Sequence, residues 1–304
     1  MHLDVTQVFR QFYMSTVGSE AGVLSVLRRT TYLLVVSLGL AIAFRSGLWN
    51  IGGEGQILWG GLLTAAVGLL IGLPTVLIIS LALVASFLAG GVWGLLAGFL
   101  KAKWNVNEIV TTLMLNFVAA ATMLEVAGGP LRDPIVLIAK TRMLPQELQF
   151  PYLAYPLNVT FLIALALIPL VYILMDRTVL GYRMRIVGSS SAVATSAGMN
   201  VKRMIMLAMF LSGGICATAG SLLVFGQFFR AEAGMTGLFG FYAIVSTLLG
   251  RSKPQMMFFT SFVLAVIITG TDSLRILGVP GGFTQMMVGL LFIIAVLREL
   301  SARK

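Results

Sequence analysis

The sequence predicts an all-α polytopic membrane protein, a bundle of about 8–10 transmembrane helices that occupies residues 1–304 as one domain. First, 58% of the residues are hydrophobic and only 11% are charged, whereas soluble domains carry about 25% charged residues. Second, charge-free runs recur that approach the roughly 20 apolar residues needed to cross a bilayer. Third, the lysines and arginines gather in the short loops between these runs.

Nine segments are candidates for the membrane-spanning helices. They are residues 30–44, the two parts of 55–100 on either side of Gly72-Leu73-Pro74, 109–128, 157–175, 204–229, 233–250, 254–271 and 276–297. The first segment is short, and the segment 233–250 begins with a glycine-rich stretch that indicates a half-helix. Residues 1–29 are too polar to span and are expected to form an N-terminal extension.

The basic residues predict which ends of these segments face the cytoplasm. The loop 176–203 holds five lysines and arginines. If this loop is cytoplasmic, the basic loops at 101–103 and 251–253 and the basic C-terminus lie on the same side, as the positive-inside rule expects. The orientation of the N-terminus stays open. Nine spans place its arginines outside, whereas a re-entrant polar break would place them inside.

Composition and motifs exclude several other functions. The net charge of +10 follows from the loop lysines and arginines, without a basic patch interleaved with aromatics, so no nucleic acid is expected as a partner. The single cysteine, Cys216, precludes an intrachain disulfide, and the single histidine, His2, indicates no metal site. The sequence has no P-loop, metal cluster, nucleophile–base pair or cofactor fingerprint. We therefore expect no cofactor and no enzymatic activity from this chain alone.

A polar stretch, Asn50-Ile51-Gly52-Gly53-Glu54-Gly55-Gln56, interrupts two long apolar runs. Ionisable groups at membrane depth usually face a cavity, a partner or the protein interior. Glycines allow the helix to break, which a membrane tolerates where protein or water surrounds the broken backbone. The stretch therefore predicts a sheltered broken helix. Its polar side chains either line a pathway or cap and staple the broken helix ends.

The cytoplasmic loop contains a second informative pattern. Residues 181–188 are basic, and residues 191–198 are small, with serine at the front, alanines in the body and Gly198 at the end. These are the preferences of a short capped helix. It lacks the large apolar face that anchors a helix in lipid, so it is better suited to a groove on another protein. The alternative is a connector without a partner.

A stripe of small residues predicts close helix packing in the segment after Pro74. Ala82, Ser86, Gly90, Gly94 and Gly98 recur every four residues. Small residues at this spacing allow two helix backbones to approach closely in lipid. We expect this stripe to pack inside one bundle rather than to form a dimer interface. The sequence shows no repeat of 20–50 residues.

Four motifs resemble the membrane permeases of bacterial ABC importers for nucleosides and simple sugars. Residues 47–56 resemble the family signature G-x-F-N-I-G-x-E-G-Q, and residues 107–116 resemble the stretch N-E-V-x-x-T-L-M-L-N. Residues 181–203 are similar to the loop that contacts the ATPase, and 249–254 resemble the element L-L-G-R-x-x-P. Two departures are Trp49, in place of the usual Phe, and the lack of an additional N-terminal spanning helix.

The resemblance implies an importer in the bacterial cell membrane. It contains a second permease chain, identical or different, cytoplasmic ABC ATPase subunits and an extracellular solute-binding protein that delivers a small-molecule substrate. The resemblance and the residue chemistry together give two groups of candidates. Those for the substrate pathway are Trp49, Asn50, Glu54, Gln56, Asn107, Glu108 and Asn116. Those for ATPase coupling, in the loop 176–203, are Tyr182, Arg183, Ala192, Ala194, Ala197 and Gly198.

Three alternatives remain open at this point. Glu108 follows the basic 101–103 loop and is expected to pair or cap at the cytoplasmic edge, in preference to a role in the pathway. Branched-chain amino acids are the nearest alternative cargo. An ion-driven secondary transporter is the alternative from another class, and it usually contains an inverted repeat, which the sequence does not reveal.

Overall fold

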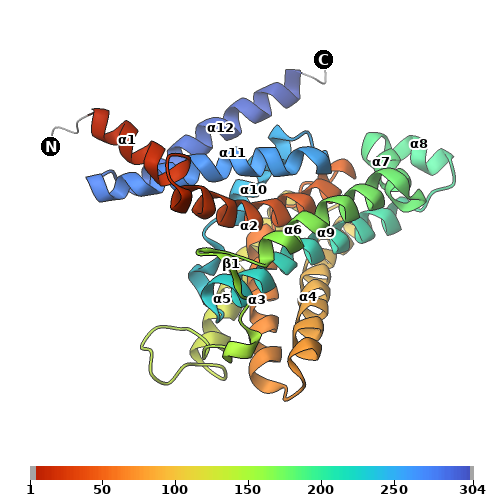
Figure 1. The fold of residues 1–304 in the computed structure, drawn as a ribbon. Coiled ribbons are helices and arrows are strands. Elements are labelled where there is room, and N and C mark those ends of the chain that lie inside the picture. Colours follow the sequence, from red (N-terminus) through yellow and green to blue (C-terminus); the bar gives the residue numbers. More distant parts are fainter. Residues whose placement is uncertain (1–4, 302–304) are drawn as a thin grey trace.

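The computed structural model describes residues 5–301 of the chain, and within them the fold is almost entirely helical (Figure 1). The long helices are α1 (Val5–Thr16), α2 (Glu20–Arg45), α3 (Gly53–Leu70), α4 (Thr75–Trp104), α5 (Glu108–Gly128), α6 (Thr160–Tyr172), α7 (Val179–Ser189), α9 (Val201–Leu223), α10 (Phe239–Leu249), α11 (Pro254–Ser273) and α12 (Gly282–Ser301). A short helix α8 (Ser191–Ser196) follows α7. Two small strands, β1 (Tyr152–Ala154) and β2 (Leu157–Asn158), pair antiparallel.

The helix lengths confirm the all-α membrane fold. Among the described residues, six helices are long and apolar enough to cross a bilayer, with α6 and α9 extended by π-helical turns. The segments Ala233–Leu249 and Gly282–Leu297 are apolar but shorter. The apolar windows of α2 and α9 are 83% and 78% buried, against 28% or less for α4, α5 and α6. Helices α2 and α9 therefore form the core of the bundle.

Each of the nine predicted segments contains a helix, but three helices start at clearly different residues, including α10, which starts at Phe239 rather than at residue 233. The first spanning helix begins at Glu20 rather than at residue 30, because Ser19 caps it by accepting a hydrogen bond from the Gly22 N–H at 3.0 Å. It therefore starts inside the predicted N-terminal extension, which also contains α1. The last helix begins at Gly282 rather than at residue 276, because Gly278 adopts a φ of +86° and Pro280 follows.

Two helices begin after the chain has turned back into the bundle. After α2 ends at Arg45, residues 46–52 return, and Gly53 at the start of α3 lies against Val36 in the middle of α2. After the π-helical end of α9, residues 229–238 return in the same way, and α10 starts at Phe239. The second return includes positive φ angles at Gly237 and Leu238. Both α3 and α10 are thus half-helices that start inside the protein.

These two returns belong to one arrangement that occurs twice. In the first half of the chain, α2 is followed by a return and then by α3, α4 and α5. In the second half, α9 is followed by a return and then by α10, α11 and α12. Helix α2 packs antiparallel on α11, through Arg29 with Asp272 and Ser37 with Ser261. Helix α9 packs antiparallel on α4 in the corresponding way.

The half-helices follow the same correspondence. Helix α3 runs parallel to α9, with the hydroxyls of Thr64 and Ser221 2.5 Å apart, and α10 runs parallel to α2, with Thr247 donating to the carbonyl of Ser37. The two halves therefore have opposite directions across the membrane, which is an inverted-topology arrangement. No sequence repeat accompanies it, so the sequence could not predict it.

The small-residue stripe of α4 packs against α9 within the chain, as predicted. A Cβ atom on Gly94 would lie 2.4 Å from the carbonyl oxygen of Met209, and one on Gly90 would lie 2.2 Å from the Cβ of Ala217. Ser86 donates a 2.9 Å hydrogen bond to the carbonyl oxygen of Ala217. Glycine is required at these positions because the two helix backbones are so close that no side chain fits between them.

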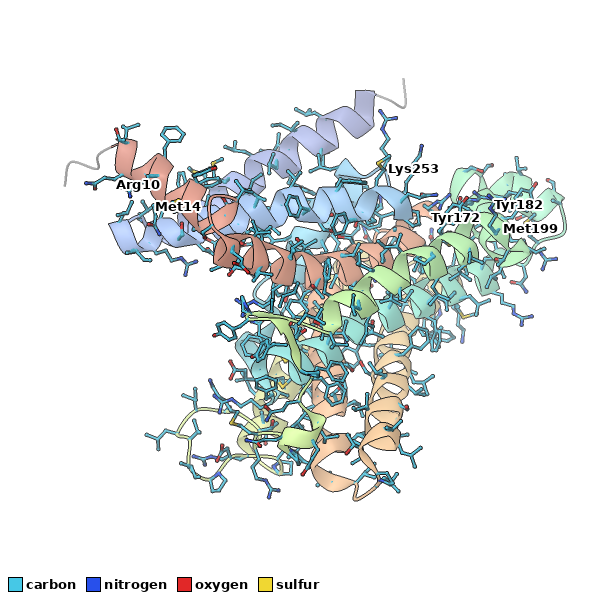
Figure 2. All side chains as sticks on the ribbon, viewed as in Figure 1. Arg10, Met14, Tyr172, Tyr182, Met199 and Lys253 are labelled. Atoms are coloured by element: carbon cyan, nitrogen blue, oxygen red, sulfur yellow. The ribbon has the colours of Figure 1, made fainter. Side chains whose placement is uncertain are left out.

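The two ends of the bundle are distinguished by charge. Tyr182 and Met199 project at one end in Figure 2, and Arg10 and Met14 lie at the opposite end. The first end carries the basic loops, so the positive-inside rule makes it cytoplasmic. Arg29 lies toward the outer end, where its Nη1 is 2.6 Å from Asp272 Oδ2. This ion pair neutralises a charge that the rule disfavours outside.

Candidate functional site

The polar stretch predicted from the sequence forms a buried junction. Asn50, which has no exposed surface, is at its centre. Its Nδ2 donates to Ser212 Oγ at 2.8 Å and to Gln56 Oε1 at 3.1 Å, and its Oδ1 accepts from Gln56 Nε2 and from the Gly52 N–H. The side chains of Asn50 and Gln56 thus bond each other across the break and connect it to α9. Buried polar groups need such partners, and here protein groups provide them.

Helix α5 satisfies the broken backbone from the other side. Thr112 Oγ1 accepts from the Ile51 N–H at 3.1 Å. Asn116 donates to the Ile51 carbonyl at 2.9 Å and accepts from the Gly55 N–H at 2.8 Å. An unpaired backbone group in the hydrocarbon region costs several kcal/mol, so these bonds allow α3 to start at membrane depth.

Glu54 joins the two half-helices. It lies in the first turn of α3, and its Oε1 accepts hydrogen bonds from the N–H groups of Gly240 at 2.8 Å and Phe241 at 3.4 Å, in the first turn of α10. The first N–H groups of a helix lack intrahelical partners and carry partial positive charge. A Cβ on Gly240 would lie 2.4 Å from the Glu54 nitrogen, so the contact also requires glycine. One carboxylate therefore stabilises two converging helix N-termini.

Three of the predicted pathway residues lie outside this junction. Trp49 packs on Phe44 with ring centroids 5.1 Å apart. Asn107 is exposed and caps α5 by accepting from the Ile109 N–H. Glu108 Oε2 lies 3.1 Å from Lys101 Nζ, so its expected pairing at the cytoplasmic edge is confirmed.

Ser212, Thr112 and Gly240 complete the junction but are not among the residues selected from the sequence. Serine and threonine are common in membrane helices, where they often bond to carbonyls of their own helix, as Thr112 also does to Glu108. Gly240 lies in a glycine-rich stretch with no distinguishing pattern. Thr112 lies within the predicted 107–116 motif, which is the one signal that could have selected it.

The predicted short helix of the cytoplasmic loop is present as α8. Ser190 caps it by accepting from the Val193 N–H at 3.3 Å, and the chain leaves it through Gly198, with a φ of +72°. Ala194 is fully buried, whereas the other predicted coupling residues are exposed. These are Tyr182, Arg183, Ala192, Ala197 and Gly198. Helix α8 thus presents a small, partly apolar face outward.

A cavity of about 450 Å³ lies beside this face, between α7, α8 and α9. Arg183, Ala197, Gly198 and Arg203 are among the residues that line it. Arg185, in contrast, pairs with Asp176, which also binds Arg45 at the end of α2 through two bonds of 2.5 and 2.8 Å. Arg185 therefore fixes α7 to the bundle, and Arg183 faces outward.

The chain belongs to the family of branched-chain amino acid transport system permease components, whose model matches residues 22–296. It is 28% identical to the glucose ABC transporter permease protein TsgB13 of Haloferax volcanii, over 100% of this chain and 83% of that protein. It is 29% identical to the guanosine ABC transporter permease protein NupP of Bacillus subtilis, over 88% and 78% of the two chains. The nucleoside permease protein NupB of Lactococcus lactis is 25% identical, over 95% and 83%.

These findings confirm the predicted class. The chain is a multi-pass protein of the cell membrane and a permease subunit of an ABC transporter.

Proposed function

We propose that this chain forms the membrane pathway of an ABC importer for nucleosides or simple sugars. The similar permeases named for glucose, guanosine and nucleosides support this cargo class. The observation that carries the proposal is the broken-helix junction at Glu54, since half-helices that start at membrane depth are typical of transport pathways.

Separate subunits supply the energy and the cargo in this proposal. The sequence has no P-loop, so ATP is hydrolysed by cytoplasmic ABC ATPase subunits. An extracellular solute-binding protein delivers the cargo to a pair of permease chains. Helix α8 is the proposed contact with the ATPase, because its exposed small side chains suit a groove on a partner.

The coupling role rests on particular residues of this region. Tyr182, Arg183, Ala192, Ala197 and Gly198 present their exposed surfaces to the ATPase. Ala194 faces inward and connects α8 to the bundle. Movement of the ATPase subunits is thereby passed to α7 and α9.

The polar residues divide into two roles in the pathway. Asn50, Glu54, Gln56 and Asn116 hold the broken helix ends, because each of these side chains bonds to protein groups. The second group shapes the cytoplasmic end of the route and consists of Trp49, Asn107 and Glu108.

Transport by the reconstituted complex tests this function. The chain is placed in proteoliposomes with its ATPase, its binding protein and any second permease chain, and uptake of radiolabelled guanosine and glucose is measured with and without ATP. We expect ATP-dependent accumulation of at least one of them. Accumulation of leucine alone, or uptake that continues with a hydrolysis-deficient ATPase, contradicts the proposal.

A further inference from the structure

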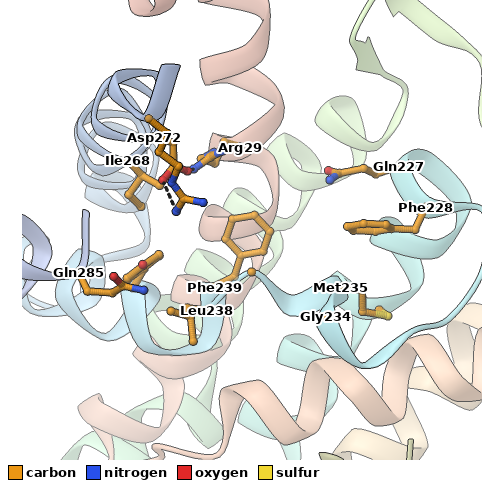
Figure 3. Close-up of a pocket in the computed structure, with 13 residues that line it drawn as sticks. Arg29, Gln227, Phe228, Gly234, Met235, Leu238, Phe239, Ile268, Asp272 and Gln285 are labelled. Atoms are coloured by element: carbon orange, nitrogen blue, oxygen red, sulfur yellow. Dashed lines mark hydrogen bonds and ion pairs between the residues drawn. The ribbon is translucent and has the colours of Figure 1, made fainter. Parts of the chain in front are cut away.

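A pocket of about 300 Å³ opens toward the outer side of the bundle, between α2, the end of α9, α10, α11 and α12 (Figure 3). Figure 3 shows Phe239 between two groups of polar side chains, with Gln227 on one side and Arg29 and Asp272 on the other. Phe239 and Tyr242 belong to α10, the half-helix whose first turn Glu54 binds. The pocket therefore adjoins the junction described above.

Several polar groups in this pocket are available to a ligand. Within the described residues, the amides of Gln227 and Gln285 and the hydroxyl of Tyr242 line the pocket without a hydrogen bond to a protein group; Tyr242 is buried, Gln227 is partly buried and Gln285 is exposed at the mouth. Each amide offers both donors and an acceptor, and a hydroxyl offers one of each type. Their placement matches a molecule that carries several hydroxyl groups.

Two arginines of the pocket share one carboxylate, that of Asp272. Asp272 accepts from Arg29 at 2.6 Å, from Arg275 at 3.1 Å and from Thr284 Oγ1 at 2.9 Å. The ammonium group of an amino acid needs carboxylate oxygens that are free to accept hydrogen bonds, whereas those of Asp272 already accept three. The remaining N–H groups of the two arginines can still donate to hydroxyl oxygens. This arrangement suits hydroxyl groups and disfavours an ammonium group, whereas the net positive charge of two arginines and one aspartate also suits a carboxylate, so leucine is one of the probes in the experiment.

Aromatic surfaces complete the pocket. Phe228, Phe239 and Tyr242 line it, and they come from the end of α9 and the start of α10. Ligand sites combine such apolar surfaces with a few convergent polar groups, at volumes of about 300–1,000 Å³. Flat apolar faces accommodate the C–H face of a hexose or the plane of a nucleobase, while the amides and arginines contact the hydroxyls.

We propose that this outer pocket binds the sugar ring of the cargo, a hexose or the ribose of a nucleoside, before it enters the pathway. Gln227, Tyr242 and Gln285 contact the hydroxyls of the sugar. Arg29 and Arg275 remain paired with Asp272 and donate their other N–H groups to the sugar oxygens. The proposal rests on the proposed function, because it names the residues that select this cargo class.

The test uses the complete reconstituted transporter with guanosine, glucose and leucine as separate probes. The double variant Gln227→Ala/Gln285→Ala removes two uncommitted amides, so KM for guanosine or glucose should rise about tenfold or more. Tyr242→Phe, which removes only a hydroxyl, should raise KM about two- to tenfold. Gln146→Ala is the matched control, because Gln146 is exposed on the outer loop and does not line the pocket.

The possible outcomes separate this inference from the proposed function. If the wild type imports guanosine or glucose and the pocket variants keep the KM of the Gln146→Ala control, the pocket assignment is overturned and the function stands. If the wild type imports only leucine, the proposed cargo class is overturned and the pocket assignment with it. A rise in KM for guanosine or glucose in the pocket variants alone supports the assignment.

Discussion

Gly188 at the end of α7 lies directly against Gly47, the first residue of the signature stretch. A Cβ on Gly188 would lie 2.7 Å from the Gly47 nitrogen and 2.6 Å from the carbonyl oxygen of Arg45, and Gly47 has a φ of +75°. The cytoplasmic loop therefore contacts, backbone against backbone, the residues that lead into the polar junction. In the proposed function, this contact is the route by which movement of an ATPase at α8 would reach the broken helix.

Replacing Gly188 by alanine should weaken coupling. The new methyl group cannot fit without separating α7 from residues 45–47. We expect the number of cargo molecules imported per ATP hydrolysed to fall in the reconstituted complex. The decrease is about tenfold if the strain reaches about 1.4 kcal/mol. Gly72→Ala is the matched control, since a Cβ there meets no atom within 4 Å. Equal coupling ratios in the two variants would show that the contact transmits nothing.

Replacing Glu54 by alanine should abolish uptake while the complex still assembles with its ATPase. The change leaves the N–H groups of Gly240 and Phe241 without their acceptor. A buried donor without a partner costs about 1–3 kcal/mol of stability. Glu54→Gln keeps an acceptor oxygen and should retain part of the activity. Glu125→Ala, at an exposed acidic position in α5, is the control for loss of a carboxylate. Normal uptake by Glu54→Ala would refute the importance of the junction.

A proline in the middle of α8 should uncouple transport from ATP hydrolysis. Ala194→Pro removes the N–H that donates to the Ser190 carbonyl, and it disrupts the buried side of the helix. Ser191→Pro is the control, because the first helical position tolerates proline and Ser190 before it is already extended. Measurements of ATPase stimulation by cargo should separate the two variants. Normal stimulation in Ala194→Pro contradicts the coupling assignment.

The packing of α4 on α9 gives a prediction about stability. Gly94→Ala places a methyl group 2.4 Å from a backbone oxygen, so the variant should lose about 1–3 kcal/mol and unfold at a lower apparent Tm in detergent. Gly289→Ala is the control, because a Cβ on Gly289 meets open space and alanine favours the helix. A Tm for Gly94→Ala equal to that of the control would contradict this packing.

The sequence predicted the helices well because membrane spans depend on local composition. Nine apolar segments each contain a helix, and the capped helix α8 follows from serine and glycine at its ends. A break in this region was also predictable, because glycines and a carboxylate in an apolar chain leave few other solutions. It lies at residues 46–52 rather than over the whole predicted stretch 50–56, because α3 already begins at Gly53.

Long-range pairings could not be predicted in the same way. The partner of Glu54 is a pair of backbone N–H groups, and since every residue except proline carries such a group, the residue type does not reveal the pairing. Arg29 and Asp272 are distant in the sequence, and no local pattern connects them. The start of α2 was placed too late because Glu20, Arg28 and Arg29 interrupt the apolar pattern of residues 20–29, whereas the helix is stabilised there by the Ser19 cap, by burial of Val26 and by this ion pair.

The Arg29–Asp272 pair also bears on how the protein is made. The two residues are separated by 243 positions, and at about 5–20 residues per second their synthesis is separated by tens of seconds. Arg29 is therefore synthesised long before its carboxylate partner exists. A chain interrupted before Asp272 lacks this partner, so we expect its first spanning helix to be less firmly oriented than in the complete protein, as accessibility labelling of the N-terminus would measure.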